Sequence, residues 1–283
     1  MELCGIATTS IPFFCCEDML HYTKHILDSE KEWVTFIHGA GGSSTIWYKQ
    51  LDDFRQQFNV LLIDLRGHGR SQSPIYEKMD YYTFEDIGND IIDVLDHLQI
   101  KTTHFIGISL GTIIIRDITH RFPERTSSMV MGGAVIKLNV RGQILMKLGV
   151  LLQKIVPFMW LYRLFALIIM PRRKHRKSRD IFVREARRMY HREFRRWFTL
   201  TREINSVLSF FRKNPLHKPT LYLMGSEDFM FLPSIRKIVQ RQKSSKLEVI
   251  PECGHVVNIE RAGAFNASAL RFLEEIMLTN QTV

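Results

Sequence analysis

The stretch that decides the fold is His104-Phe105-Ile106-Gly107-Ile108-Ser109-Leu110-Gly111. The apolar run at 104–106 predicts a buried strand, and residues 110–121 predict a helix. The G-x-S-x-G pattern between them puts Ser109 on a sharp strand-to-helix turn, where its hydroxyl stands clear of the sheet. Glycines are expected at 107 and 111 because a Cβ there would collide with neighbouring backbone. The stretch therefore predicts a nucleophilic serine.

Two later polar residues follow strands in an order that suits this nucleophile. Gly225-Ser226-Glu227-Asp228 comes after the apolar run 221–224, and Gly254-His255 comes after the run 247–250. A serine needs an imidazole to take its proton and a buried carboxylate to orient that imidazole. We therefore expect a catalytic triad of Ser109, His255 as base and Asp228 as acid. Glu227 is the competing acid.

The oxyanion formed during acyl transfer needs two backbone N–H donors. Leu110, the residue after the nucleophile, is expected to supply one, and Ala40 in the loop 38–42 the other. A glycine-rich turn after a strand can also bind pyrophosphate, with Asp64 as a ribose ligand. However, Ser44 stands where G-x-G-x-x-G requires its third glycine, and the sequence has no P-loop triplet. We expect no cofactor.

Six apolar runs separated by helical patterns predict a mostly parallel sheet with both faces covered: 33–37, 60–63, 104–106, 129–131, 221–224 and 247–250. Thr83 is expected to cap a helix that continues to about residue 98, and the last helix is expected over about 264–277. Residues 19–26 are expected to add an antiparallel edge hairpin.

The alternation of strand and helix stops after Gly133 and resumes near Pro219. Between them lie two apolar helical stretches, 143–155 and 158–170, separated by Pro157 and followed by a nearly all-basic run over 172–179. We therefore predict a core formed by residues 1–133 and 218–283, with an all-helical cap inserted at 134–217.

The net charge of +10 belongs to this insertion. Residues 141–213 contain 19 Lys or Arg against 4 Asp or Glu, a net of +15, and the remainder contains 20 against 25, a net of −5. This asymmetry supports the division of the chain into a mildly acidic body and a basic inserted segment.

Together the motifs His38-Gly39, Asp64 to Ser71, 107–111, Gly225-x-x-Asp228 and Gly254-His255 resemble the α/β-hydrolase superfamily. The resemblance is closest to its serine-nucleophile branch of esterases, lipases and lactonases, which has a helical cap after the sixth strand. It implies an α/β fold with a mostly parallel central sheet, helices on both faces and an inserted all-helical cap. In this family the stretch matching 64–71 is a structural turn. Ser109 argues against the dehalogenases and epoxide hydrolases of the family, which use a carboxylate nucleophile.

Two classes of function fit these residues. The first is an enzyme that hydrolyses a carboxylic ester with a hydrophobic, lipid-like acyl chain through an acyl-enzyme at Ser109; a lactone or thioester would use the same machinery. The second is a small-ligand sensing or signalling protein with slow or no turnover, because known receptors on this fold keep their triad. Turnover of acyl esters separates the two classes.

The basic run, mixed with Phe194, Trp197 and Phe198, fits contact with an anionic membrane surface. A solvated charged face is the equal alternative, and without a nucleic-acid motif no nucleic acid is expected. His97, His104 and His120 lack ligand-like spacing, so no metal is expected. The four cysteines form no disulfide framework, and residues 1–6 do not read as a signal peptide. Both point to the cytoplasm, and the basic run adds an expected peripheral contact with membrane.

Overall fold

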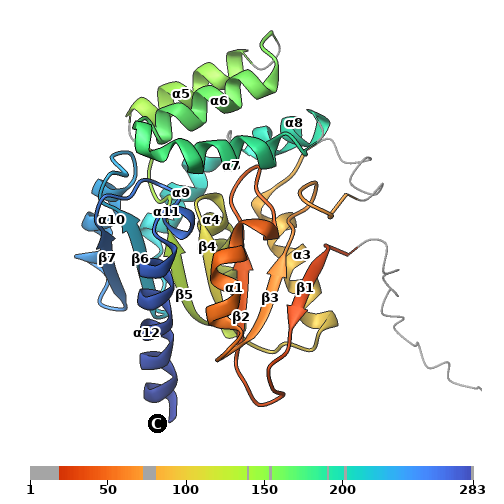
Figure 1. Cartoon of the computed structure of the whole chain (residues 1–283), viewed down its shortest axis with the longest axis vertical. Coiled ribbons are helices and arrows are strands. Elements are labelled where there is room, and N and C mark those ends of the chain that lie inside the picture. Colours follow the sequence, from red (N-terminus) through yellow and green to blue (C-terminus); the bar gives the residue numbers. More distant parts are fainter. Residues whose placement is uncertain are drawn as a thin grey trace, which may run out of the picture.

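A seven-stranded sheet forms the centre of the molecule (Figure 1). The computed structural model describes residues 19–72, 81–138, 140–152, 155–189, 191–200 and 203–281. The strand order is β1-β3-β2-β4-β5-β6-β7, and every neighbouring pair is parallel except β1 and β3. The strands are β1 Tyr22–His25, β2 Trp33–Ile37, β3 Asn59–Ile63, β4 Thr103–Ile108, β5 Thr126–Gly132, β6 Thr220–Gly225 and β7 Ser245–Ile250. The mostly parallel sheet is thus confirmed.

Helices cover both faces of the sheet (Figure 1). On one face lie α1 (Tyr48–Phe54), α11 (Val257–Glu260) and α12 (Ala262–Gln281), and on the other lie α3 (Phe84–His97) and α4 (Leu110–Arg121). Helix α10 (Leu232–Val239) packs on β6 and β7. Because both faces are covered, β3, β4 and β6 are buried along their whole length.

The start of α3 shows how local sequence sets an element. The Thr83 hydroxyl accepts the Asp86 N–H at 3.0 Å, and the Asp86 carboxylate accepts the Thr83 N–H at 3.1 Å. This capping box satisfies two N–H groups that have no partner inside the helix, and it confirms Thr83 as the predicted cap. Helix α12 extends beyond the predicted range at both ends.

The predicted antiparallel edge is confirmed, but the predicted hairpin is wrong. In the described part of the chain, residues 19–26 contribute one strand, β1, which pairs antiparallel with β3 rather than with a neighbour in sequence. Strand β2 offers no free edge, because β3 and β4 occupy both of its sides. The chain therefore passes β2 before the partner of β1 is formed.

A run of helices lies between β5 and β6, and we call residues 134–217 the helical insert. Its described helices are α5 Val140–Leu152, α6 Phe158–Ile169, α7 Arg176–Ala186, α8 His191–Thr199 and α9 Ile204–Lys213. Helices α5 and α6 form an outer pair, with α7 and α8 between this pair and the end of the sheet (Figure 1). The insert follows the fifth strand of the described sheet, not the sixth, since the edge has one strand where a hairpin was expected. Its limits at 134 and 217 remain a prediction.

Candidate active site

Ser109 occupies the turn between β4 and α4. Its φ is +53° and its ψ −118°, a backbone conformation that residues with a Cβ rarely adopt. Its N–H donates to the Gly132 carbonyl at 3.0 Å, and its own carbonyl accepts the Thr112 hydroxyl at 2.6 Å. The Thr112 hydroxyl also accepts the N–H of Val135, at the start of the insert. The strained turn is therefore held from both sides, by β5 and by Thr112.

The two glycines beside the serine are needed for different reasons. A Cβ on Gly111 would lie 2.4 Å from the Ile37 carbonyl oxygen, so only glycine lets α4 start this close to β2. A Cβ on Gly107 would first meet the side-chain Cδ1 of Ile115, also at 2.4 Å. The predicted collision with backbone is thus confirmed at 111, whereas at 107 the nearest obstacle is a side chain.

The three predicted triad residues lie in one hydrogen-bonded chain. His255 Nε2 is 2.9 Å from Ser109 Oγ, and His255 Nδ1 is 2.8 Å from Asp228 Oδ2. The other carboxylate oxygen of Asp228 accepts the Phe231 N–H at 3.1 Å. Because a carboxylate accepts, Nδ1 carries the imidazole proton and the lone pair of Nε2 faces the serine hydroxyl. Both Asp228 and His255 are buried.

Glu227, the competing acid, points away from His255 and toward the insert. Its carboxylate lies 2.6 Å from Arg172, 2.5 Å from Lys174 and 2.9 Å from His175 Nε2. Burial acts to raise the pKa of Glu227, but these partners prevail and hold it below its ordinary value. In this geometry Glu227 anchors the insert to the loop that carries Asp228.

His175 was missed by the sequence analysis because it stands among arginines and lysines. It is buried, and its Nε2 is also 3.7 Å from the Glu260 carboxylate. Glu260 in turn accepts the Gly254 N–H at 2.7 Å, next to His255. The insert thus contacts the loops of both predicted triad partners of Ser109.

Backbone hydrogen bonds orient the loop 38–42. The Gly39 carbonyl accepts the Gly42 N–H at 3.1 Å and contacts His38 Nδ1 at 2.8 Å. In a trans peptide the N–H points opposite to the carbonyl, so the Ala40 N–H is directed away from these two donors. Ala40 lines the same cavity as Ser109 and Leu110. The structure therefore brings the two predicted oxyanion residues together beside the serine.

The next peptide of this loop is held at both ends. The Gly41 N–H donates to His68 Nε2 at 2.9 Å, and the Ala40 carbonyl accepts the Tyr162 hydroxyl of α6 at 2.8 Å. Burial lowers the pKa of His68 to about 3, so its ring is neutral and can accept. His68 lies in the turn 64–71, and its ring holds the loop 38–42 beside Ser109. Tyr162 connects this loop to the insert.

Asp64 uses its carboxylate inside the protein. Its two oxygens accept the Ser44 N–H at 2.6 Å and the Arg70 N–H at 2.9 Å. A ribose ligand needs a carboxylate that faces a ligand, and this one faces two backbone donors. The geometry therefore does not favour the dinucleotide interpretation of the loop.

Ser109 lies at the wall of an apolar cavity of about 180 Å³. The insert lines it together with the described residues outside the insert, which we call the sheet domain. None of the described lining side chains is charged: Ala40, Gly41, Phe84, Ser109, Leu110, Ile113, Val135, Leu138, Leu148, Gly149, Leu152, Leu161, Tyr162, Leu164, Phe165, Ile169, Met189, Trp197, Leu200, Ile204 and Phe231. A smaller space of about 30 Å³ also borders Ser109 and is lined by His255, Ile181, Phe182 and the charged Glu185, among others. A bound molecule that reaches Ser109 can therefore extend in two directions.

The cysteines and the other histidines were also considered as possible site residues. Cys253 is buried, and burial raises the pKa of its thiol. His104 lies between Ser128 and Glu32. Within the described residues no three His, Cys, Asp or Glu side chains gather as metal ligands would. Cys4, Cys15 and Cys16 lie outside the described residues.

Comparison with known proteins places the chain in a family. The profile of the alpha/beta hydrolase fold family matches residues 32–262. The chain therefore belongs to this family, and the α/β-hydrolase fold expected from the motifs is confirmed.

Relatives with assigned activities are distant. A putative carbamate hydrolase, RutD of Agrobacterium fabrum, is 26% identical over 90% of this chain and 98% of its own length. The 3-oxoadipate enol-lactonase 2 of Acinetobacter baylyi is 30% identical, but the match spans only 39% of this chain and 40% of the lactonase. A carboxylesterase structure from Nitrososphaera gargenis superposes with a TM-score of 0.74 at 21% identity, over 92% of this chain and 96% of the other. These relatives support a hydrolase.

Proposed function

We propose that this protein is a serine hydrolase that cleaves a carboxylic ester with an apolar acyl chain. The observation that carries the proposal is the chain Ser109–His255–Asp228, with distances of 2.9 and 2.8 Å, at the wall of a cavity whose described lining is uncharged. In the first step His255 Nε2 takes the proton of Ser109 Oγ, which attacks the ester carbonyl. Asp228 stabilises the imidazolium that results.

The negative charge then develops on the former carbonyl oxygen. The N–H groups of Ala40 and Leu110 stabilise this oxyanion, aided by the N-terminus of α4 behind Leu110. Collapse of the intermediate breaks the ester bond, and His255 returns its proton to the leaving alcohol. Water, deprotonated by the same imidazole, then releases the acid from Ser109.

The cavity supports an apolar acyl group. A carboxylate or ammonium on the acyl chain would lose its hydration among leucine, isoleucine and phenylalanine side chains without gaining a partner. The larger space suits the acyl chain, and the smaller one beside His255 suits the leaving group. Lactonases and esterases among the relatives are consistent with this reaction class.

The test is turnover of a p-nitrophenyl ester series from acetate to dodecanoate, together with labelling by a fluorophosphonate probe. Ser109→Ala should abolish labelling and lower kcat/KM by roughly a thousandfold or more. Ser226→Ala, an exposed serine on the loop before Asp228, is the matched control and should behave as the wild type. Full labelling of Ser109→Ala would exclude the assigned nucleophile. Labelling without turnover of any ester would favour a ligand-sensing protein.

A further inference from the structure

The outer pair of helices, α5 and α6, exposes a surface of large apolar side chains. Their exposed fractions run from 42 to 80%: Ile144, Leu148, Leu151, Ile155, Trp160, Leu164 and Leu167. On α5 the first three recur at intervals of four and three residues, and the last three do the same on α6, so each set forms one stripe along its helix. Ile155 follows the end of α5. We call these seven residues the outer apolar face. Soluble surfaces rarely gather this many large apolar groups without a partner.

This face is not the one that packs on the protein. On α6 the buried residues Leu161, Tyr162, Ala166 and Ile169 lie on the side opposite Trp160, Leu164 and Leu167. A helix that is apolar on both sides needs an apolar environment on both. The cavity and the sheet domain supply only one of them.

The outer apolar face borders the cavity that contains Ser109. Leu148 and Leu164 are exposed at the surface and also line the cavity. At this place one layer of side chains separates the outside from the cavity. An acyl chain that enters here meets apolar groups along its whole path to Ser109.

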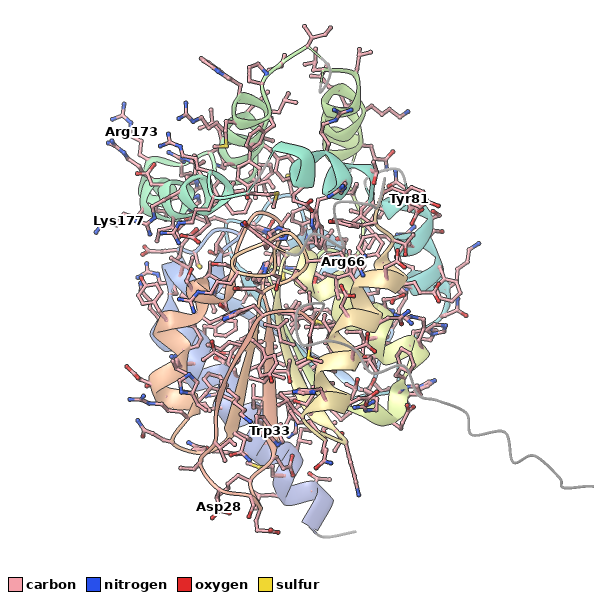
Figure 2. All side chains as sticks on the ribbon, turned by 90° about the vertical axis from the view of Figure 1, so that its right-hand side faces the viewer. Asp28, Trp33, Arg66, Tyr81, Arg173 and Lys177 are labelled. Atoms are coloured by element: carbon pink, nitrogen blue, oxygen red, sulfur yellow. The ribbon has the colours of Figure 1, made fainter. Side chains whose placement is uncertain are left out.

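Basic side chains surround this face. Lys147 on α5 and Arg163 on α6 are exposed beside the stripes, and Arg173, Arg176 and Lys177 are exposed on the adjoining segment. Figure 2 shows Arg173 and Lys177 projecting outward from the side of the insert. Arg172 and Lys174 instead contact Glu227, so they hold the insert to the sheet domain. The positive charge that stays exposed is suited to a negatively charged surface.

Trp197, which was expected to contact a membrane, does not have that place. Trp197 is buried, lines the cavity and donates its indole N–H to the Arg66 carbonyl. The side chains of Phe194 and Phe198 lie outside those that the structure describes. Most of the exposed large apolar side chains in the described part of the insert belong to the outer apolar face.

We infer that the outer apolar face inserts into the surface of an anionic bilayer, with the surrounding lysines and arginines at the lipid headgroups. No helix in the described part of the chain is long and apolar enough to cross a bilayer, so the contact is peripheral. The ester then passes from the lipid into the cavity between Leu148 and Leu164. This last step rests on the proposed hydrolase function, whereas membrane binding does not.

Trp160 provides a built-in reporter for the test. Of the four tryptophans it is the exposed one, since Trp47 and Trp197 are buried and Trp33 is partly buried. The full chain is mixed with phosphatidylcholine vesicles with or without phosphatidylglycerol, and bound protein is measured by sedimentation. Vesicles with the anionic lipid should bind more protein, shift Trp160 emission to the blue and release the protein as salt is raised.

Variants separate the apolar and charged parts. Leu151→Glu should reduce binding roughly tenfold or more, because it places a charge among the inserting groups. Neutralising Arg173 and Lys177 to Gln should reduce binding roughly fivefold per residue. Ile26→Glu, at a similarly exposed apolar residue outside the insert, is the matched control and should bind as the wild type.

Two further measurements complete the test. Sedimentation velocity without lipid checks whether a second copy covers the face instead. Hydrolysis of p-nitrophenyl butyrate checks each variant and should stay at the wild-type rate, since none of the varied residues Leu151, Arg173, Lys177 and Ile26 is among those that line the cavity. Failure to bind anionic vesicles, equal binding to neutral ones, or a lipid-free dimer lost in Leu151→Glu would overturn the inference. Binding to vesicles without hydrolysis of any ester would overturn the proposed function but would still support the inferred membrane contact of the outer apolar face.

Discussion

The sheet domain and the helical insert build the two sides of one cavity by different means. On the sheet side, Ser109, His255 and Asp228 are fixed by hydrogen bonds, and neutral His68 holds the neighbouring loop. On the insert side, leucine, isoleucine and phenylalanine side chains of α5, α6 and α9 form the wall by contact alone. The sheet domain is mildly acidic, whereas the insert concentrates the positive charge.

This difference suggests that the sheet domain sets the geometry of the reaction and that the insert sets the selectivity for the acyl chain. A reacting group displaced by about 1 Å can lose roughly a hundredfold in rate, so the hydrogen-bonded side tolerates little change. An apolar wall tolerates volume-conserving substitution and can be reshaped without loss of the fold. Substitutions in the sheet domain should therefore affect every ester equally, and those in the insert should depend on the length of the acyl chain.

The largest effect is expected on the sheet side, at Asp228. Asp228→Asn should lower kcat by about 10²–10⁴-fold for short and long p-nitrophenyl esters alike, because the imidazole loses the partner that orients it. Circular dichroism should show an intact fold. Glu227→Gln is the matched control and should retain most of the activity, since Glu227 contacts the insert. A severe loss in Glu227→Gln with a mild one in Asp228→Asn would reverse the assignment of the acid.

On the insert side, Gly149 offers a place to narrow the cavity. Gly149→Leu should lower kcat/KM for the dodecanoate ester roughly tenfold or more, because the new side chain occupies space that the acyl chain needs. The butyrate ester should react as before. Gly263→Leu, on α12 with open space around it, controls for the substitution itself. Equal losses on both esters would contradict a selective role for the insert.

Tyr162 belongs to the insert but contacts the predicted oxyanion loop, so its substitution should affect all esters, by a smaller factor. Tyr162→Phe removes the hydroxyl that the Ala40 carbonyl accepts, and the loss of one such bond should lower kcat roughly fivefold for all chain lengths. Tyr222→Phe is the control, because the buried hydroxyl of Tyr222 on β6 lies near Arg116 of α4 and not at the loop 38–42. An effect on long esters alone would make Tyr162 only a part of the acyl wall.

The features that the sequence predicted correctly depend on neighbours along the chain. Buried runs, the Thr83 cap and the turn at 107–111 each have their cause within a few residues. The order of Ser109, Asp228 and His255 was informative because the carboxyl ends of parallel strands meet at one edge of a sheet. These regularities were enough to predict the fold and the three residues Ser109, Asp228 and His255, which the structure brings together.

The features that were missed depend on contacts distant in sequence. His175 meets Glu227, and Tyr162 meets Ala40, only once the insert has packed on the sheet domain. The hairpin predicted at residues 19–26 was wrong because β1 pairs with the strand that has a free edge, β3, which comes later in the chain. Trp197 was expected at the surface since its neighbours are arginines, but Arg196 itself is buried against Glu193.

The helical insert separates two strands that pair with each other, β5 and β6, and this affects how the chain folds while it is being translated. Strand β5 ends at Gly132, and its neighbour β6 begins at Thr220. At about 5–20 residues per second, a ribosome needs on the order of ten seconds to make the chain between them. During that time the apolar run at 129–131 is an unpaired sheet edge, which can pair wrongly with other chains. We therefore expect the yield of folded protein to depend on how quickly residues 133–219 are translated.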